Sequence, residues 1–284
     1  MATVEEALSP REPIRGPSAL AGDLRRTLTL TMAIAKNDFK LRFFGSVLGY
    51  VWTLMRPLML FGVLYVIFTQ FVPVDAPSFG VALLLGIVLF TFFSEATGGA
   101  VMSVMDRENL VRKIHFPRMV IPLAVVLMAC FNLGLNLVVV IIFAIASGIT
   151  PGFGWLAMFP LVALLTVFAS GLAMMLSALY VRYRDVEPIW DVVLQVTFYG
   201  SLILVPYEVI RLKSEFVASA LVANPLAAVL QEARHLVVDP SYASAAGALS
   251  SPALLLVPLA ITAATFALGL WVFNREAPRI AEAL

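Results

Sequence analysis

Long apolar runs separated by short polar segments make up most of this chain between residues 47 and 273. Five of these runs are predicted to cross a bilayer, because a helix of ~20 apolar residues spans the hydrocarbon core. They lie at residues 47–72, 79–102, 120–146, 155–180 and 252–273. A further run, residues 189–205, has about 17 residues, which is the lower limit for a crossing. The pattern therefore predicts six transmembrane helices.

Two shorter apolar pieces, residues 216–223 and 226–238, lie between the fifth and sixth spans and are separated by Asn224-Pro225. Neither piece is long enough to cross a bilayer. Irregular backbone at membrane depth is tolerated only where protein or a water-filled cavity surrounds it. We therefore expect a re-entrant hairpin of two half-helices on the outer side. The alternative is a domain that lies on the surface of the outer leaflet.

The region before the first span has a different pattern. Apolar residues recur at helical spacing from residue 27, and Lys36, Lys40 and Arg42 lie between them. This pattern predicts an interfacial amphipathic helix, with its apolar face toward the acyl chains and its cations toward lipid phosphates. The alternative is an extra turn that leads into the first span. Residues 1–26 are polar and Pro-rich, so we expect a disordered cytoplasmic tail and no cleavable signal peptide.

Composition agrees with a membrane protein. Hydrophobic residues make up 61% of the chain and charged residues 13%, whereas soluble domains have ~45–50% and ~25%. The net charge of +1 indicates no nucleic-acid partner. The single cysteine, Cys130, excludes an internal disulfide and a zinc site built from several cysteines. We expect an all-α integral membrane protein with a tail at 1–26, a transmembrane domain at 27–274 and a second cytoplasmic tail at 275–284.

A short charged island, residues 105–118, separates the second and third spans. Its basic residues outnumber its acidic ones: Arg107, Arg112, Lys113 and Arg118 stand against Asp106 and Glu108. An excess of Lys and Arg in a short loop places that loop in the cytoplasm, and the same rule places both termini there. Residues 109–116 have the length of a short helix that Pro117 ends. The island could bind a soluble partner, or it could be a solvated loop that only sets the topology.

Residues suited to catalysis or metal binding are sparse. The sequence has no Gly-x-x-x-x-Gly-Lys-Ser/Thr loop, no Gly-x-Ser-x-Gly and no His-Glu-x-x-His. His115 and His235 fall on opposite sides of the expected membrane, so we expect no metal site and no catalytic residue. Polar groups within the spans are few: Glu95, Asn132, Asn136, Asp191 and Gln195. An ionisable residue in a span suggests function, although Glu95 could instead lie near the cytoplasmic end in a structural role.

Aromatic residues are the more prominent feature of the spans. Their faces can stack on sugar rings and also tolerate lipid, which would suit a passage for a glycolipid. For each residue the alternative is ordinary packing. The candidates for lining such a path, together with Glu95, are Tyr65, Phe68, Phe198 and Tyr199.

Several segments, in this order, resemble the membrane subunit of ABC-2-type exporters of polysaccharides, O-antigens and teichoic acids. The resemblance extends over roughly residues 24–273. The segments that carry it are residues 38–42, 48–52 and 56–58 at the first span, 92–96 in the second, 108–118 in the island, 182–186 in the next inside loop, and 224–226 with Arg234 further on.

The resemblance implies a half-transporter of the bacterial inner membrane. Two copies would pair above two copies of a separate ATPase, which would bind ATP and Mg, and this chain would hold no cofactor. The interfacial helix would be a gate, with Lys36, Phe39, Lys40 and Arg42 as its candidate residues. The ATPase-coupling loop would contain Asp106, Arg107, Glu108, Asn109, Leu110, Arg112, Lys113 and His115.

The expected function is therefore ATP-driven export of a lipid-linked polysaccharide or teichoic-acid-type polymer from the cytoplasmic leaflet outward. Two alternatives remain open at this point. One is an exporter permease of the same superfamily for a drug or small lipid. The other is a membrane enzyme that acts on a lipid carrier.

Overall fold

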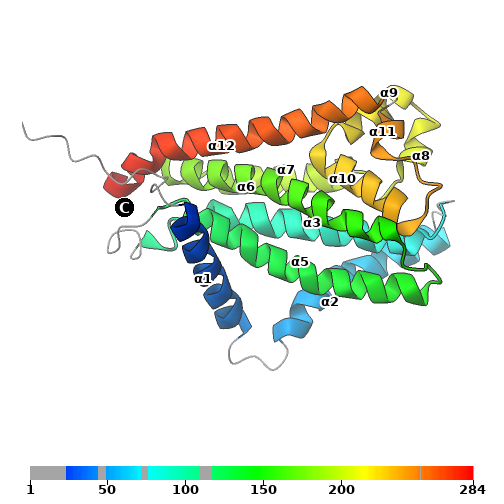
Figure 1. The fold of residues 1–284 in the computed structure, drawn as a ribbon, viewed down its shortest axis with the longest axis horizontal. Coiled ribbons are helices and arrows are strands. Elements are labelled where there is room, and N and C mark those ends of the chain that lie inside the picture. The colour runs from blue at the N-terminus through cyan, green and yellow to red at the C-terminus, as the bar shows by residue number, and fades with distance from the viewer. Residues whose placement is uncertain (1–23, 44–48, 72–75, 109–116, 250, 284) are drawn as a thin grey trace, which may run out of the picture.

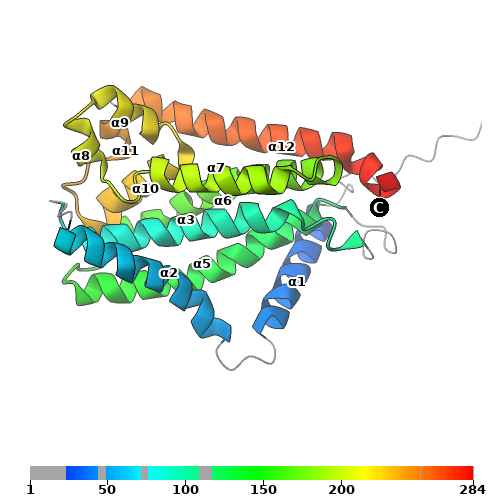
Figure 2. The same ribbon diagram turned by 180° about the vertical axis from the view of Figure 1, so that it is seen from behind.

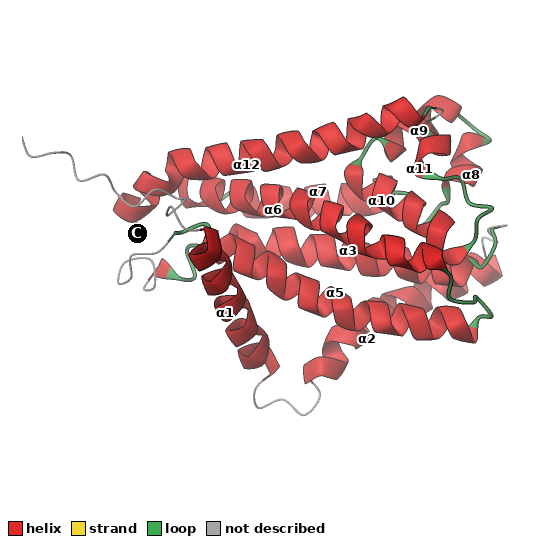
Figure 3. Cartoon of the chain, viewed as in Figure 1, coloured by secondary structure: helices red, strands yellow, loops and turns green. Residues whose placement is uncertain are grey.

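The protein is a bundle of long helices that run side by side, with shorter helices gathered at one end (Figures 1 and 3). The computed structural model describes residues 24–43, 49–71, 76–108, 117–249 and 251–283, and the regular structure in these ranges is helical. The long elements are α2 (Gly49–Val66) with its π-helical extension η2 (Ile67–Phe71), α3 (Phe79–Val101), α5 (Val120–Ala146), α6 (Met158–Arg182) after η3 (Phe153–Ala157), α7 (Val186–Gly200) and α12 (Leu256–Ala283).

Five helical stretches are long and apolar enough to cross a membrane within the described ranges. They are Val51–Phe71, Phe79–Val101, Val120–Ala146, Phe153–Arg182 and Ala253–Glu276, and they coincide with five of the six expected spans. The structure is thus that of an all-α, multi-pass membrane protein. The remaining span, expected at 189–205, corresponds to α7, which has 15 residues and ends at Gly200.

The early end of α7 has a tertiary cause. Leu202 adopts a left-handed φ of 61°, which an α-helix cannot accommodate. The fully buried guanidinium of Arg234 holds this turn, because Nη1 donates to the Leu202 carbonyl at 2.6 Å and Nη2 to the Ile203 carbonyl at 2.9 Å. Nη2 also lies 3.5 Å from the Ala82 carbonyl in α3. The partner that ends α7 therefore lies about thirty residues further along the chain.

Helix α3 is the centre of the bundle. Within its most apolar window 72% of the residues are buried, compared with 6% for α2 and 17% for α12. Helices α2, α5, α6 and α7 all pack against α3. The contact with α7 includes a polar bond, since the Trp190 indole donates to the Thr97 hydroxyl at 3.1 Å. The apolar outer faces of α2 and α12 are consequently left for lipid or for a second chain.

Helices α6 and α12 approach each other more closely than any side chain would permit. A Cβ added at Gly269 would lie 2.0 Å from the carbonyl oxygen of Gly171. A Cβ added at Gly171 would lie 2.7 Å from both the nitrogen and the Cα of Phe266. Such contacts between small residues are a common way for transmembrane helices to associate. The two backbones therefore form one closely packed unit.

The short helices are α8 (Tyr207–Arg211), α9 (Glu215–Val222), α10 (Pro225–Ala233) with η4 (Arg234–Val238), α11 (Ala245–Ala248) and η5 (Pro252–Leu255). Helix α9 meets α10 and η4 at 99° across a short break. Asn224 caps α10 by accepting a hydrogen bond from the Leu226 amide at 3.0 Å, and Pro225 occupies the first turn. The sequence predicts two short helices that meet at Asn224-Pro225, and the structure has them there. Their depth in a membrane stays a prediction, although α10 is buried against α3, α6 and α12.

Both ends of the described chain are more helical than expected. Helix α1 (Leu24–Phe43) begins three residues before the expected start at residue 27. Residues 275–283, expected as a tail, continue α12, because the helix formers Arg, Glu and Ala dominate this segment. Figures 1 and 2 show α1 leaving the bundle obliquely and α2 returning to it, so that the two helices form a V beside α5.

Candidate functional site

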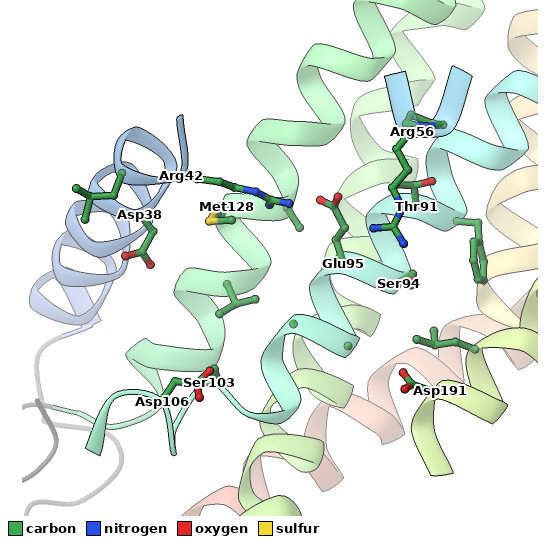
Figure 4. Close-up of a pocket in the computed structure, with 18 of the residues that line it drawn as sticks. Asp38, Arg42, Arg56, Thr91, Ser94, Glu95, Ser103, Asp106, Met128 and Asp191 are labelled. Carbon is green, nitrogen blue, oxygen red and sulfur yellow. The ribbon is translucent and has the colours of Figure 1, made fainter. Parts of the chain in front are cut away.

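A cavity of about 850 Å³, here called the central cavity, lies between α1, α2, α3, α5 and α7 (Figure 4). Apolar side chains such as Leu60, Phe90 and Val125 form part of its wall. Seven charged side chains also line it: Asp38, Arg42, Arg56, Glu95, Asp106, Arg107 and Asp191. Charged groups in a membrane protein gather at sites of function, because burial in hydrocarbon would be costly. The central cavity is therefore the candidate functional site.

Glu95 lies in the middle of this charged group. Arg42 comes from the last turn of α1 and Arg56 from the second turn of α2. Figure 4 shows both side chains directed toward the Glu95 carboxylate from opposite sides. The carboxylate is held by α5, since Asn132 Nδ2 donates to Glu95 Oε2 at 2.8 Å. Asn136 Nδ2 donates in turn to the Asn132 carbonyl at 2.9 Å, which extends the polar contacts along α5.

A smaller cavity of about 290 Å³, here called the side cavity, adjoins this group between α1 and α2. Arg42, Arg56 and Glu95 line it as they line the central cavity. Trp52 and the hydroxyl side chains Thr53 and Thr91 complete most of its polar lining. The two arginines thus face a space that contains hydrogen-bonding groups and is flanked by an exposed indole.

An ion pair connects α1 to the segment that follows α3. Arg107 Nη2 donates to Asp38 Oδ2, and both side chains are about three-quarters buried, with 24% and 23% of their surfaces exposed. Shielding from water makes such a pair stronger than one at an open surface. Because Arg107 immediately precedes the rest of the charged island, the pair joins the expected gate helix to the base of the expected coupling loop.

Part of the predicted coupling loop lies within the described residues. Asp106 and Arg107 line the central cavity, and Glu108 is the last described residue before the gap at 109–116. The remaining predicted residues of this loop lie outside the described ranges: Asn109, Leu110, Arg112, Lys113 and His115. The short helix expected at 109–116 stays a prediction.

The four residues of α1 that are predicted to form a gate take different positions. Phe39 packs edge-on against Phe131 of α5, with ring centroids 5.6 Å apart, and so fixes α1 to the bundle. Arg42 reaches both cavities. Lys36 and Lys40 are exposed and line neither of the two cavities. Two sides of α1 can thus be distinguished, one toward the cavities and one away from them.

The structure does not bring the five predicted path residues together, although all five are described. Glu95 lines the central cavity, whereas Tyr65 and Phe68 line a separate cavity of about 410 Å³ near η2 and the start of α3. Phe198 packs against Phe90 at 4.9 Å between ring centroids, and the neighbouring Tyr199 is 71% exposed. These residues thus line different surfaces within one copy of the chain, and their role in a translocation path stays a prediction.

The sequence prediction omitted three charged residues from the site: Asp38, Arg56 and Asp191. Arg56 lies two turns inside the apolar run that is predicted as the first span. A charged residue within a predicted span is a sign of a functional site, and this sign was available for both Arg56 and Asp191. The partner of Glu95, Asn132, is 37 positions away, and no local pattern links the two.

Comparison with known proteins agrees with this architecture. Residues 29–237 match the ABC-2 type transporter family, so the chain belongs to this family of membrane transport proteins. It is 28% identical over 211 residues to an O-antigen export system permease protein RfbA of Klebsiella pneumoniae, which covers 74% of this chain and 80% of that protein. The RfbA protein of Myxococcus xanthus is 28% identical over 213 residues, with coverage of 74% and 81%.

Proposed function

We propose that this chain is the membrane-spanning subunit of an ATP-driven exporter that moves a lipid-linked polysaccharide or teichoic-acid-type polymer from the cytoplasmic leaflet outward. The observation that carries the proposal is the central cavity, in which charged and apolar side chains from α1, α2, α3, α5 and α7 line one space. An amphiphile with a polar head and a hydrocarbon tail matches such a wall. Family membership supports transport, and the names of the relatives support a polysaccharide as cargo.

The proposed assembly contains two copies of this chain and two copies of a separate ATPase. The ATPase would bind ATP and Mg and dock on the charged island, with both termini of this chain on the same, cytoplasmic side of the bacterial inner membrane. The sequence supports a separate ATPase because it contains no P-loop motif. The mostly exposed apolar face of α2 supports pairing with a second copy.

In this proposal α1 acts as the gate for the substrate. Phe39 anchors α1 to α5, while Asp38 ties it to Arg107 at the base of the docking loop. Movement of that loop on ATP binding would therefore pull directly on α1. Glu95, which Asn132 holds, lines the same cavity and would meet the polar part of the substrate after it has passed the gate.

Deletion of the gene in its host tests the proposal. We expect surface polysaccharide to be lost and finished lipid-linked polymer to accumulate inside, with both effects reversed by the wild-type gene. Unchanged surface polysaccharide would refute the proposed cargo. Loss of the polymer both outside and inside would instead indicate an enzyme of its synthesis. Purification of the tagged chain in mild detergent should recover a P-loop ATPase in equal amount.

A further inference from the structure

A cluster of polar groups lies where α8 meets the end of α10, away from the central and side cavities. Gln231 of α10 faces Glu208 of α8, and its Nε2 donates to Glu208 Oε1 at 3.2 Å. The Ala243 amide donates to the same oxygen at 2.8 Å. Arg234 follows Gln231 by three positions and so shares its face of the helix. The Glu208 carboxylate also attracts the Arg234 guanidinium electrostatically. Two opposite charges and an amide thus form one cluster.

Three polar atoms of this cluster are buried, and none of them has a hydrogen-bond partner among the described residues: Glu208 Oε2, Gln231 Oε1 and Arg234 Nε. Gln231 and Arg234 are fully buried, so their side chains are out of reach of bulk solvent. Nearly all buried polar groups in folded proteins have a partner, because an unpaired group keeps the cost of its desolvation. The three atoms therefore indicate a small ligand at this place.

The Arg234 guanidinium is not free to turn toward Glu208. Its Nη1 and Nη2 are already bonded to the three backbone carbonyls described above. Helix α3 packs directly against the group, since a Cβ added at Gly86 would lie 3.5 Å from Nη2. Within the described ranges, no nitrogen of Arg234 forms an ion pair with Glu208. The separation between the two charges therefore suits a bridging molecule and not a direct bond.

The donor and acceptor roles of the three atoms indicate which molecule fits. Gln231 Nε2 faces two groups that can only accept, Glu208 Oε1 and the Ala243 carbonyl at 2.9 Å, so the orientation of the amide is fixed and Oε1 points elsewhere as an acceptor. Glu208 Oε2 also accepts, whereas Arg234 Nε carries a hydrogen and only donates. A water molecule donates two hydrogens and accepts others, and a buried water typically forms about three hydrogen bonds. An anion would meet two acceptors here, and a cation would meet the hydrogen of a guanidinium.

We propose that one buried water molecule is bound between Glu208 Oε2, Gln231 Oε1 and Arg234 Nε. The water donates to the two oxygens and accepts from the nitrogen, so that Glu208 and Arg234 form a water-bridged ion pair. This bridge joins α8 to the helix that Arg234 fixes on α3, and it hydrates two charges that would be costly to bury unpaired. The site lies among the short helices and does not depend on the cargo proposed above.

Electron cryomicroscopy of the full-length chain in lipid nanodiscs, at a resolution that shows ordered water, tests the site. We expect one density peak at about 2.7–3.2 Å from each of the three atoms. Gln231→Met should abolish this peak, because it removes one of only three partners and leaves an apolar side chain of similar length. Glu232→Met is the matched control: it places the same side chain at the next position of α10, where the carboxylate accepts from the Ala245 amide instead, and the peak should stay.

Three results would overturn the proposal. A wild-type map without the peak, in which Glu208 Oε2 and Gln231 Oε1 lie within hydrogen-bond distance, would mean that Glu208 carries a proton and bonds Gln231 directly. A peak surrounded by six or more oxygen atoms at about 2.3–2.6 Å would mean a calcium ion. An undiminished peak in Gln231→Met would mean that other groups hold the water. If Gln231→Met does not fold, the wild-type map alone decides, and deletion of the gene tests the exporter function separately.

Discussion

Replacement of Gly269 by Ala is a direct test of the packing between α6 and α12. The new Cβ would lie 2.0 Å from the Gly171 carbonyl oxygen and 3.0 Å from its Cα. A carbon and an oxygen that are not bonded need a separation of more than 3 Å, roughly the limit of observed weak contacts. The two backbones must therefore move apart by about 1 Å, because neither contains a side chain that could rotate away.

The cost can be estimated from two opposing effects. Forcing a methyl group into a packed contact costs about 1–3 kcal/mol, and we take the upper end because the obstacle is backbone. Alanine is favoured over glycine inside a helix by about 1 kcal/mol, which offsets part of this cost. We expect a net loss of about 2 kcal/mol in the free energy of unfolding. At 2–4 °C per kcal/mol for chains of this size, the Tm should fall by about 4–8 °C.

The assay heats the detergent-solubilised chain to a series of temperatures. Size-exclusion chromatography then measures the fraction that remains monodisperse at each temperature, which gives the Tm. Gly134→Ala is the matched control, because an added Cβ in the middle of α5 meets nothing within 4 Å. This variant should keep the Tm or raise it by a few degrees, since only the gain in helix propensity remains. Equal shifts in Gly269→Ala and Gly134→Ala would refute the close contact.

Three other predictions concern polar contacts. Asp38→Arg and Arg107→Asp should each reduce the amount of polymer exported per ATP hydrolysed. The double variant, in which the two charges are exchanged, should recover most of this export. A double variant without recovery would show that the two side chains do not act through their ion pair. Arg234→Met should lower the free energy of unfolding by about 2–4 kcal/mol, since two buried carbonyls lose their donor, and Arg234→Lys should recover only part of this. An unchanged free energy of unfolding in Arg234→Met would show that Arg234 does not stabilise the turn after α7. Trp190→Phe should lower the free energy of unfolding by about 1 kcal/mol, because the hydrogen bond to Thr97 is lost. Thr97→Val should lower it much less in the Trp190→Phe background than in the wild-type chain, because the two residues share one bond.

The features that sequence predicted well depend on local chemistry or on hydropathy. Asn224-Pro225 supplies a cap and a first-turn proline, so the break between α9 and α10 could be placed almost to the residue. The long spans follow from apolar length alone. Neither inference requires knowledge of which helix faces meet.

The features that sequence missed depend on contacts between distant segments. The end of α7 is fixed by Arg234, which lies more than thirty positions beyond Gly200. The side chains around Glu95 come from α1, α2 and α5: two arginines and the amide of Asn132. Hydropathy carries no information on how these helices rotate toward one another. An aromatic residue in a span can be packed, exposed or lining a cavity without any change in the local pattern, so sequence alone could not place Tyr65, Phe68, Phe198 and Tyr199.

The contact between Arg234 and the Ala82 carbonyl determines where the hairpin can bend. Arg234 joins the end of α10 to α3 and to the turn after α7, so these three segments share one anchor point. A spin label on α10 should therefore keep a constant distance to one on α3 throughout a transport cycle. A label on Phe216, whose side chain is 82% exposed on α9, is free of that anchor. Any hinge for opening this end of the bundle belongs at Asn224-Pro225, ahead of the anchored helix.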